Sequence, residues 1–307
     1  MLTPLEELHW RTKGYTTSQC INLNVDNVTF DVINHYKNIT IRNDFGDEPE
    51  LMFPSRRYKS LNKISLNKKL LSCAQQLLDG PVRLIQSVAW AKKHSKTYEQ
   101  SNSDQRHHMD YGNNSFVHPP SWNNPNVVSC IVYLSDTNET GGATAIVPRN
   151  GNEDEWYKPP YIKMPGQSTY PFINDRKKAE STMISLGCDR SELYEREVKI
   201  HMKKGDVLWY RHDVWHRGTP VKKGCVRYVI NLAYAKPNAP INVWNSGFTQ
   251  KMYYGWLEDY ISSLNNYQLF AIGFPHPLDA YWTNETIEYT SARYKLDIKN
   301  YVMNSML

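Results

Sequence analysis

The hydrophobic positions in the central half of this chain form short runs that are rich in β-branched and aromatic residues. Such runs are typical of buried β-strands. They cover residues 82–90 (VRLIQSVAW), 127–134 (VVSCIVYL), 143–147, 207–211 and 227–234 (RYVINLAY). Turn-forming sequences separate several of them, including residues 137–142 and the Gly205-Asp206 pair. No helical period intervenes, so the pattern predicts an antiparallel sandwich or barrel rather than β-α-β units.

Helical spacing of apolar residues marks two segments that flank these strands. The first covers residues 66–78, and Gly80 and Pro81 end it. The second covers residues 249–264, where apolar residues recur every four positions and predict an amphipathic helix on the outside of the sheet. Residues 150–199 are rich in Pro, Gly and charge, with a short helix expected at 176–184. A connection of this length commonly carries function, here as a lid.

Length and composition fit one globular domain with a sizeable core. The chain has 307 residues, of which 40% are hydrophobic and 22% are charged. No repeat or break in composition marks a boundary. We therefore expect one domain over residues 1–307, with a core at about 82–235, a lid-like insertion at about 150–199 and a C-terminal helical decoration at about 249–307. Residues 1–58 show no pattern that assigns them.

Cysteine usage and charge indicate which cellular compartment and which classes of binding partner to expect. The five cysteines are scattered without a CxxC pair, and neither a signal peptide nor an apolar run of ~18 residues is evident. This favours the cytoplasm or another reducing intracellular compartment, without a membrane partner. The net charge is +5, and the densest basic stretch, residues 56–69, fits a solvated helix face better than a nucleic-acid surface. A small anionic molecule suits this charge, whereas the oligomeric state is not indicated.

Candidate chemistry begins with the His-x-Asp sequence at His108 and Asp110. On an extended strand, residues i and i+2 point to the same face, so both side chains can reach one metal ion. His216 lies just past a strand and a turn, where a third ligand can meet the first two. Two histidines and one carboxylate suit divalent iron and leave positions open for co-substrate and oxygen. Arg227 opens the next strand, and its guanidinium suits a dicarboxylic co-substrate.

Other interpretations of these histidines remain open. If the stretch around His212 and His216 were helical, both side chains would lie on one helix face, as in helical zinc sites. The β-rich flanks disfavour that arrangement. His107 adjoins the proposed ligands but points to the opposite face of a strand, which indicates a structural role. The three proposed ligands would, on a further interpretation, only satisfy hydrogen bonds in the core of a barrel.

The run from residue 108 to residue 234 resembles the phytanoyl-CoA dioxygenase family of iron(II)/2-oxoglutarate oxygenases. Four ordered features carry the resemblance: HMD at 108–110, VVSCIVYLSDTNETGGATAIVPRNG at 127–151, GDVLWYRHDVWHRG at 205–218, and Arg227. Residues 273–283 (GFPHPLDAYWT) also resemble the tails of bacterial members. The resemblance implies a mainly β fold with flanking helices, built on a double-stranded β-helix, which is a jelly-roll or cupin-like barrel.

The same resemblance implies roles for individual residues. It implies that His108, Asp110 and His216 bind iron(II), and that Arg227 pairs with the distal carboxylate of 2-oxoglutarate. A hydroxyl donor commonly stands two residues after the second ligand histidine in this family, where this chain has a glycine at 218. Thr219 is the candidate for that hydrogen bond.

Residues of the strand at 127–134 are expected beside the co-substrate. Ser129, Ile131 and Tyr133 share one face of this strand, so Ile131 or Tyr133 is expected to wall the 2-oxoglutarate pocket.

The implied reaction oxidises an unactivated C–H bond, consumes O2 and releases succinate and CO2. Asp110 argues against halogenation, because related halogenating enzymes have Gly or Ala in its place. Hydroxylation is the default outcome, and desaturation or oxidative cyclisation, as in kainoid-type biosynthesis, uses the same ligands. The weaker candidates for binding the substrate are Arg106, Tyr111, Arg149 and Gln86. The alternatives are an oxygenase that acts on a protein or nucleic acid, or a non-catalytic metal-binding barrel.

Overall fold

The computed structural model describes most of the chain. The described residues are 1–18, 23–37, 39, 48–53, 55–94, 104–111, 115, 117–158, 175–241, 261–263, 266, 269, 274–294 and 296–303.

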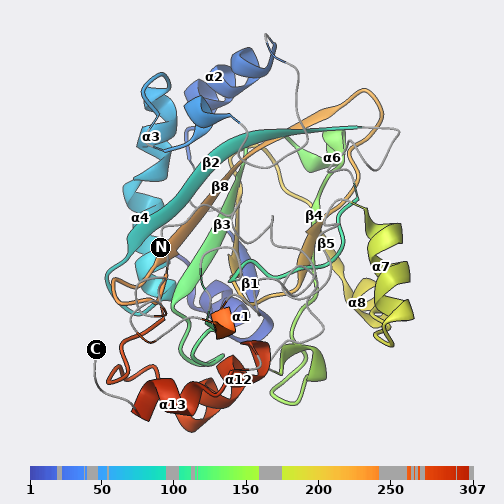
Figure 1. Ribbon diagram of the computed structural model, residues 1–307. Helices are drawn as coiled ribbons and strands as arrows, with labels where there is room; N and C mark the ends of the chain where they lie inside the picture. The colour runs from blue at the N-terminus through green and yellow to red at the C-terminus, as the bar shows by residue number, and fades with distance from the viewer. Residues whose placement is uncertain are drawn as a thin grey trace.

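The larger of two antiparallel sheets has five strands in the order β1-β6-β3-β8-β2 (Figure 1). They are β1 (Tyr15–Ser18), β2 (Arg83–Lys93), β3 (Val127–Tyr133), β6 (Val207–Arg211) and β8 (Val226–Ala235). All seven residues of β3 are buried. This is expected for a central strand that is covered on both faces, and it explains why its sequence reads as a continuous apolar run.

The smaller sheet has three strands in the order β5-β4-β7. They are β4 (Thr144–Ile146), β5 (Val198–Ile200) and β7 (His216–Gly218). One apolar cluster joins the two sheets, because it contains Ile131 and Val229 from the larger sheet and Ile146 and Ile200 from the smaller one. The space between the sheets is therefore a packed core, and side chains on the inner faces of both sheets meet there.

Helices α2 (Asp26–Lys37), α3 (Lys59–Ser65) and α4 (Lys68–Leu77) cover the outer face of the larger sheet (Figure 1). The 3-10 helix η1 (Pro49–Leu51) lies between α2 and α3 in the chain. In α4 the buried residues Leu70, Cys73, Ala74 and Leu77 recur at spacings of three and four, so one stripe of the helix faces the sheet. Burial of this stripe against the apolar outer face of the sheet is the main source of its stability.

The remaining helices lie at the periphery. Helix α1 (Pro4–Lys13) begins with a capping box between Thr3 and Glu6 and ends at Gly14, which has a positive φ of 91° and leads directly into β1. The short α6 (Thr137–Thr140) and the 3-10 helix η3 (Glu155–Tyr157) precede α7 (Arg176–Ser185) and α8 (Ser191–Arg196). Near the C-terminus, α12 (Asn284–Tyr294) and α13 (Ile298–Met303) pack on each other.

The prediction of mainly β structure with flanking helices is confirmed. The five predicted strands correspond to β2, β3, β4, β6 and β8, and the helix predicted at 66–78 corresponds to α4. The helix expected at 176–184 is α7. Closure of the two sheets into a double-stranded β-helix remains a prediction.

Other expectations need correction. The central half contains two helices that were not predicted, because α6 lies in the predicted turn at 137–142 and α8 lies between α7 and β5. Their apolar positions are too few to give a period. Residues 1–58, left unassigned, form α1, β1 and α2. The predicted helix at 249–264 falls almost entirely outside the described residues, as does part of the proposed lid, residues 159–174.

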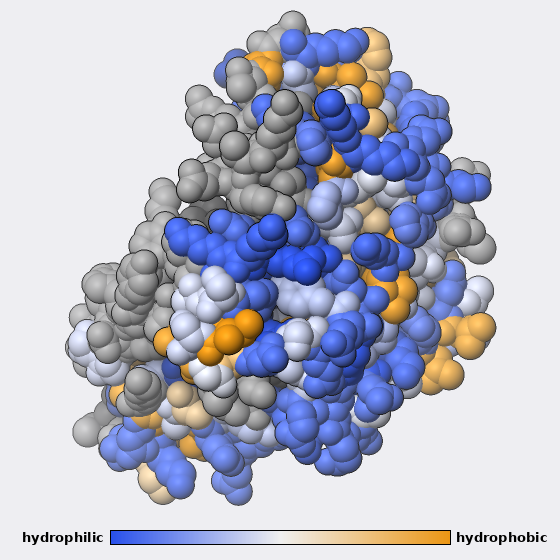
Figure 2. Space-filling model, turned by 90° about the vertical axis from the view of Figure 1, so that its right-hand side faces the viewer, coloured by the Kyte–Doolittle hydropathy of each residue, from blue (hydrophilic) through white to orange (hydrophobic). Residues whose placement is uncertain are grey.

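The side of the molecule that carries α7 and α8 is mostly hydrophilic (Figure 2). Hydrophobic residues on that face occur in small separate groups. Ile184 of α7 and Leu186, which directly follows this helix, are exposed. Within the described part of the chain, no helix has the length and hydrophobicity needed to cross a membrane.

Candidate metal centre

His108, Asp110 and His216 come together on the inner side of the smaller sheet. One ligand atom from each side chain lies within 4.8 Å of the corresponding atoms of the other two. Nε2 of His216 is 3.5 Å from Oδ2 of Asp110, and Nε2 of His108 is 3.7 Å from Oδ1. Two imidazoles and a carboxylate at these distances have the donor set and the spacing that a divalent transition metal ion requires.

Backbone pairing brings the two halves of this site together. His108 and His216 form an isolated antiparallel bridge, in which each backbone N–H donates to the other residue's carbonyl oxygen at 2.9 and 3.0 Å. The backbone N–H of Asp110 donates to the carbonyl oxygen of His212 at 2.9 Å. The segment around His108 was expected to be a strand. It forms no continuous ladder, because its pairing consists of isolated bridges and single backbone hydrogen bonds, such as the one from the Gln105 N–H to the Gly218 carbonyl oxygen at 3.1 Å.

Tyr210 of β6 supports two of the three proposed ligands. Its hydroxyl donates to Oδ2 of Asp110 at 2.8 Å, and its ring lies 4.8 Å from that of His216, centroid to centroid. Tyr210 is 4% exposed. Sequence reasoning missed this residue. The signal was present, because alternation along β6 places Tyr210 on the inner face together with Leu208, which belongs to the inter-sheet core.

The pKa values of His108 and Asp110 favour the protonation states that metal binding requires. Burial lowers the pKa of His108 well below its ordinary value, and the nearby His216 lowers it further. Burial raises the pKa of Asp110, but His216, His108 and the Tyr210 hydroxyl together lower it more, with a net decrease. Neutral imidazoles and an ionised carboxylate are the forms that bind a metal cation.

A buried ionic network supports the far side of the segment that carries His108. Arg217 of β7 pairs with Glu197 at 2.6 Å and with Asp104 at 2.6 Å. His107, which is fully buried, lies 3.2 Å from Glu197. Burial lowers the pKa of His107 to about 4, and the pKa of Glu197 falls to about 2 because His107 and Arg217 outweigh its burial. His107 therefore points away from the proposed metal ligands, as predicted.

The helical zinc interpretation of His212 and His216 is wrong. His212 lies in the turn after β6 and His216 begins β7, so the two residues do not share a helix. Burial lowers the pKa of His212 to about 4. Its side chain lines a pocket next to the metal site instead of joining the three-residue cluster.

Arg227 lies buried on the inner face of β8. It is 3% exposed, its Nη1 donates to the Gly142 carbonyl oxygen at 2.6 Å, and its guanidinium lies 5.4 Å from the Trp90 ring. Its buried Nε has no hydrogen-bond partner among the described residues. Gly142, with a φ of 72°, leaves the room for this side chain, because a Cβ there would lie 3.2 Å from Cδ of Arg227. A carboxylate is the natural partner for such a group.

The other residues predicted to contact 2-oxoglutarate lie near Arg227 or on the same inner face. Tyr133 and Ile131 pack in the inter-sheet core, and the Tyr133 hydroxyl lies 2.8 Å from that of Thr144. Burial raises the pKa of Tyr133, and Arg227 opposes that rise, which reflects their proximity. The Thr219 hydroxyl donates to the carbonyl oxygen of Ala143 at 2.7 Å, so its one proton is already used.

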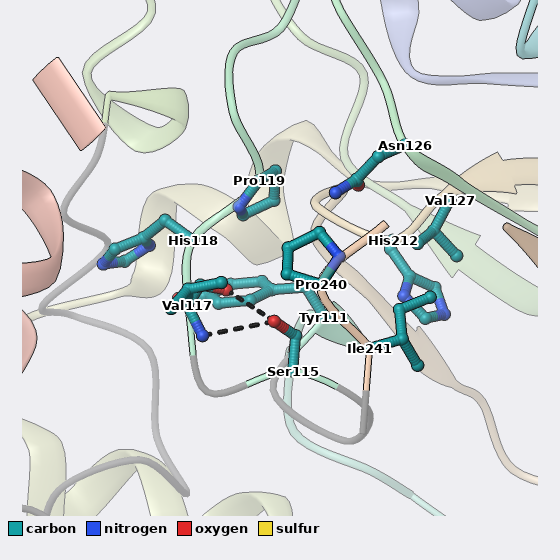
Figure 3. Close-up of a pocket in the computed structure, with 10 residues that line it drawn as sticks. All are labelled: Tyr111, Ser115, Val117, His118, Pro119, Asn126, Val127, His212, Pro240 and Ile241. Atoms are coloured by element: carbon teal, nitrogen blue, oxygen red, sulfur yellow. Dashed lines mark hydrogen bonds between the residues drawn. The ribbon is translucent and has the colours of Figure 1, made fainter. Parts of the chain in front are cut away.

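A small pocket is lined by Tyr111, the residue that follows Asp110. Tyr111 lies at its centre between His118 and His212 (Figure 3). The backbone N–H of Tyr111 donates to the carbonyl oxygen of His212, the same oxygen that accepts from Asp110. The pocket wall is thus attached directly to a proposed ligand. The other lining residues are Ser115, Val117, Pro119, Asn126, Val127, Pro240 and Ile241.

The remaining predicted substrate residues occupy different places. Arg106 is buried, and its charge acts on His108, so it lies near the metal centre. Arg149 stacks on the Trp122 ring at 4.5 Å, away from the pocket. Gln86 lies on β2, where it pairs with Ala233 of β8. Alternation places it on the same face as Trp90, inside the inter-sheet space.

Arg293 of α12 was not identified from the sequence. Its guanidinium lies 5.1 Å from the centre of the Tyr111 ring, and Tyr111 lines the pocket. All three of its nitrogens are buried and have no hydrogen-bond partner among the described residues. The surrounding sequence gave no signal for this position, because its relation to Tyr111 depends on how the C-terminal helices pack.

Residues 94–235 match the sequence model of the 2OG-Fe(II) oxygenase superfamily. The match covers just under half of the chain. Proteins of that superfamily use iron(II) and 2-oxoglutarate, and the cluster of two histidines and one carboxylate in this chain has the donor set for the metal. No curated protein sequence that was compared with the chain matches it.

Two solved structures are similar to this chain in fold. One is the epimerase SnoN in complex with Fe3+, alpha-ketoglutarate and nogalamycin RO, with a TM-score of 0.51, 13% identity, and coverage of 81% of this chain and 89% of that chain. The other is the non-heme alpha-ketoglutarate-dependent carbocyclase SnoK from nogalamycin biosynthesis, with a TM-score of 0.53, 14% identity, and coverage of 76% and 84%. At these identities the likeness concerns the fold alone.

Proposed function

We propose that this protein is an iron(II)- and 2-oxoglutarate-dependent oxygenase that oxidises an unactivated C–H bond of a small anionic molecule. His108, Asp110 and His216 hold the metal, and Arg227 binds the distal carboxylate of the co-substrate. The observation that carries the proposal is the juxtaposition of two histidines and one aspartate, within 4.8 Å of one another, on the inner side of the sheets that also bury Arg227. The motif spacing favours the phytanoyl-CoA dioxygenase-like branch of the superfamily.

When bound, iron and 2-oxoglutarate would use O2 to oxidise a substrate C–H bond, with 2-oxoglutarate converted to succinate and CO2. The protein contributes position and environment. Tyr210 fixes the Asp110 carboxylate through its hydrogen bond, and the paired backbones of His108 and His216 fix the two imidazoles. Arg227 orients the co-substrate from the opposite end. The apolar residues between the sheets keep water away from the reacting atoms.

The pocket beside Asp110 is our candidate for the substrate site. Its lining combines apolar side chains with Asn126, His118 and His212, the mixture that orients a small ligand by a few polar groups. Arg293 gives the strongest reason to expect a negative charge on the substrate. Among the described residues the nitrogens of this buried guanidinium have no acceptor, which is costly unless an anion completes it. A substrate carboxylate that approaches Tyr111 would supply these acceptors.

A small substrate also fits the solved structures with the same fold. SnoN and SnoK are named as enzymes of nogalamycin biosynthesis, an epimerase and a carbocyclase. The outcome at the C–H bond therefore differs among proteins of this fold, and hydroxylation, desaturation and cyclisation are all compatible with the ligands of this chain.

Spectroscopy tests the metal and co-substrate sites without knowledge of the substrate. We expect anaerobic addition of iron(II) and then 2-oxoglutarate to produce a visible charge-transfer band that neither component gives alone. The Asp110→Ala variant is expected to lose this band. A wild-type protein that binds iron but gives no band with 2-oxoglutarate would indicate a non-catalytic metal-binding barrel.

Succinate formation then identifies the substrate class. Acidic amino-acid derivatives and acyl thioesters are the first candidates, with peptides and single-stranded oligonucleotides as the polymeric comparison. We expect an anionic small molecule to stimulate succinate release over the uncoupled background. Stimulation by the polymers alone would contradict the proposed substrate class and leave the oxygenase assignment intact.

A further inference from the structure

Lys92 is a buried lysine near the end of β2. It is 2% exposed, and its position pairs in register with Arg227 of β8. Directly opposed residues on antiparallel strands point to the same face, so both cations project into the space between the sheets. Nζ of Lys92 donates to the Thr219 carbonyl oxygen at 2.9 Å. Neither Lys92 nor Arg227 has an ion-pair partner in the part of the chain that the structure describes.

Two unneutralised cations side by side in a dry interior are unfavourable. Each loses its hydration, and each repels the other. Burial lowers the pKa of Lys92 well below its ordinary value, and the charge of Arg227 lowers it further. Asp104 acts in the opposite direction, but only from beyond ion-pair distance. A carboxylate bound between Lys92 and Arg227 would turn this repulsion into two attractions.

The backbone at position 218 leaves room for the Lys92 ammonium. A Cβ added at Gly218 would lie 2.7 Å from Nζ of Lys92 and 2.7 Å from Oε1 of Gln105, closer than such atoms approach in proteins. Any side chain at position 218 would therefore clash with the Lys92 ammonium where it now lies. The hydroxyl of the adjacent Thr219 donates to Ala143. Gly218 has no side chain, and the Thr219 hydroxyl is already bound to Ala143, so neither residue offers a free hydrogen-bond donor. The Lys92 ammonium supplies a donor at this place.

We propose that Lys92 is a second cation for the distal carboxylate of 2-oxoglutarate, acting together with Arg227. The carboxylate has two oxygens with several acceptor positions, so a guanidinium and an ammonium can both bind it. The consequence is selectivity, because a 2-oxo acid without a terminal carboxylate leaves both cations unneutralised. This inference rests on the proposed binding of 2-oxoglutarate near Arg227 and adds a residue that the sequence motifs do not include.

The test compares two ligands that differ only at the distal end. 2-Oxopentanoate has the same chain as 2-oxoglutarate with a methyl group in place of the terminal carboxylate. Binding of each to the iron(II)-loaded protein is measured by anaerobic calorimetry. For Lys92→Met we expect 2-oxoglutarate to bind roughly 30-fold more weakly or worse, as on loss of one member of a buried charge pair, with 2-oxopentanoate unchanged. The matched control is Lys93→Met, on the neighbouring position of β2, which faces the other way.

A second variant displaces the ammonium without removing it. Gly218→Ala puts a methyl group where Nζ now lies, so it should weaken 2-oxoglutarate binding selectively, as Lys92→Met does. Thermal unfolding of the metal-free protein separates binding from structure. Because the lysine is uncompensated before the ligand binds, Lys92→Met should leave the melting temperature unchanged or raise it.

The outcomes are distinguishable. Weaker 2-oxoglutarate binding, unchanged 2-oxopentanoate binding and an undiminished melting temperature support the inference. If Lys92→Met weakens both ligands equally, or neither, while the wild type prefers 2-oxoglutarate, the inference is wrong and the proposed function stands. If the wild type itself shows no preference for 2-oxoglutarate, both are overturned.

Discussion

Replacement of Tyr210 by phenylalanine isolates one hydrogen bond in the metal centre. The hydroxyl of Tyr210 donates to Oδ2 of Asp110 at 2.8 Å, and both groups are shielded from solvent. Phenylalanine keeps the ring that packs 4.8 Å from His216, so the substitution removes a donor and little volume. The carboxylate of Asp110 then keeps its charge with one fewer donor to hold its orientation.

The expected effect follows from the charge on the acceptor. A hydrogen bond to a charged group contributes about 1.5–3 kcal/mol. Loss of a group that orients a metal ligand typically costs about 10- to 100-fold in metal affinity, which is about 1.4–2.8 kcal/mol and agrees with that range. We therefore expect Tyr210→Phe to raise the dissociation constant for iron(II) by about 10- to 100-fold, and to lower the free energy of unfolding of the metal-free protein by a smaller amount.

Anaerobic calorimetry with iron(II), repeated with cobalt(II) as an air-stable probe, measures this effect. Tyr228→Phe is the matched control, because Tyr228 lies on the opposite, outer side of the larger sheet, near Tyr36. It should leave metal affinity unchanged. A Tyr210→Phe protein that folds normally and binds both metals like the wild type would refute the argument that this hydroxyl positions Asp110.

Three further predictions address other parts of the molecule. His216→Ala should abolish iron(II) binding in calorimetry, whereas His212→Ala should retain it, since only His216 belongs to the three-residue cluster; the reverse result would contradict the assigned ligands. Once a substrate is known, Arg293→Gln should raise its KM by about tenfold or more with little change in 2-oxoglutarate affinity, and an unchanged KM would exclude Arg293 from substrate binding. Asp154→Asn should destabilise the protein by about 1.5–3 kcal/mol at neutral pH, because buried Asp154 accepts hydrogen bonds from Arg196. Burial raises the pKa of Asp154, but Arg196 and nearby backbone N–H groups lower it more, to a net value below that of the unfolded chain. The stabilisation is therefore complete above the unfolded pKa of about 3.9 and is lost as the pH falls below it, so chemical unfolding at pH 7 and pH 3 should show a smaller difference from the wild type at pH 3.

The strands and the grouping of His108, Asp110 and His216 could be predicted because their signals are local. Runs such as 127–134 are apolar on both faces, as expected for a strand that is covered on both sides. His108 and Asp110 lie two residues apart, so their shared face is a property of the backbone alone. His216 was found through the turn and strand that precede it. In each case a few adjacent residues determine the geometry.

The positions that were missed depend on contacts between distant parts of the chain. Lys92 and Arg227 become neighbours only through the pairing of β2 with β8, and nothing near residue 92 in the sequence indicates a buried charge. Arg293 meets Tyr111 because helix α12 packs against the described residues Tyr111 and His118. The first 18 residues gave no period because α1 has only one buried residue, Trp10, and is defined mainly by its caps.

The edge strand β1 connects the amino-terminal segment to the candidate metal centre, because it pairs with β6, the strand that carries Tyr210. It pairs with β6 along its whole length, from Tyr15 opposite Tyr210 to Ser18 opposite Val207. Removal of residues 1–18 would leave one side of β6 with unpaired amide and carbonyl groups, which invites intermolecular strand addition and aggregation. It would also loosen the strand from which Tyr210 reaches Asp110. A protein shortened at this end would thus be expected to lose solubility and iron together, even though every metal ligand is still present.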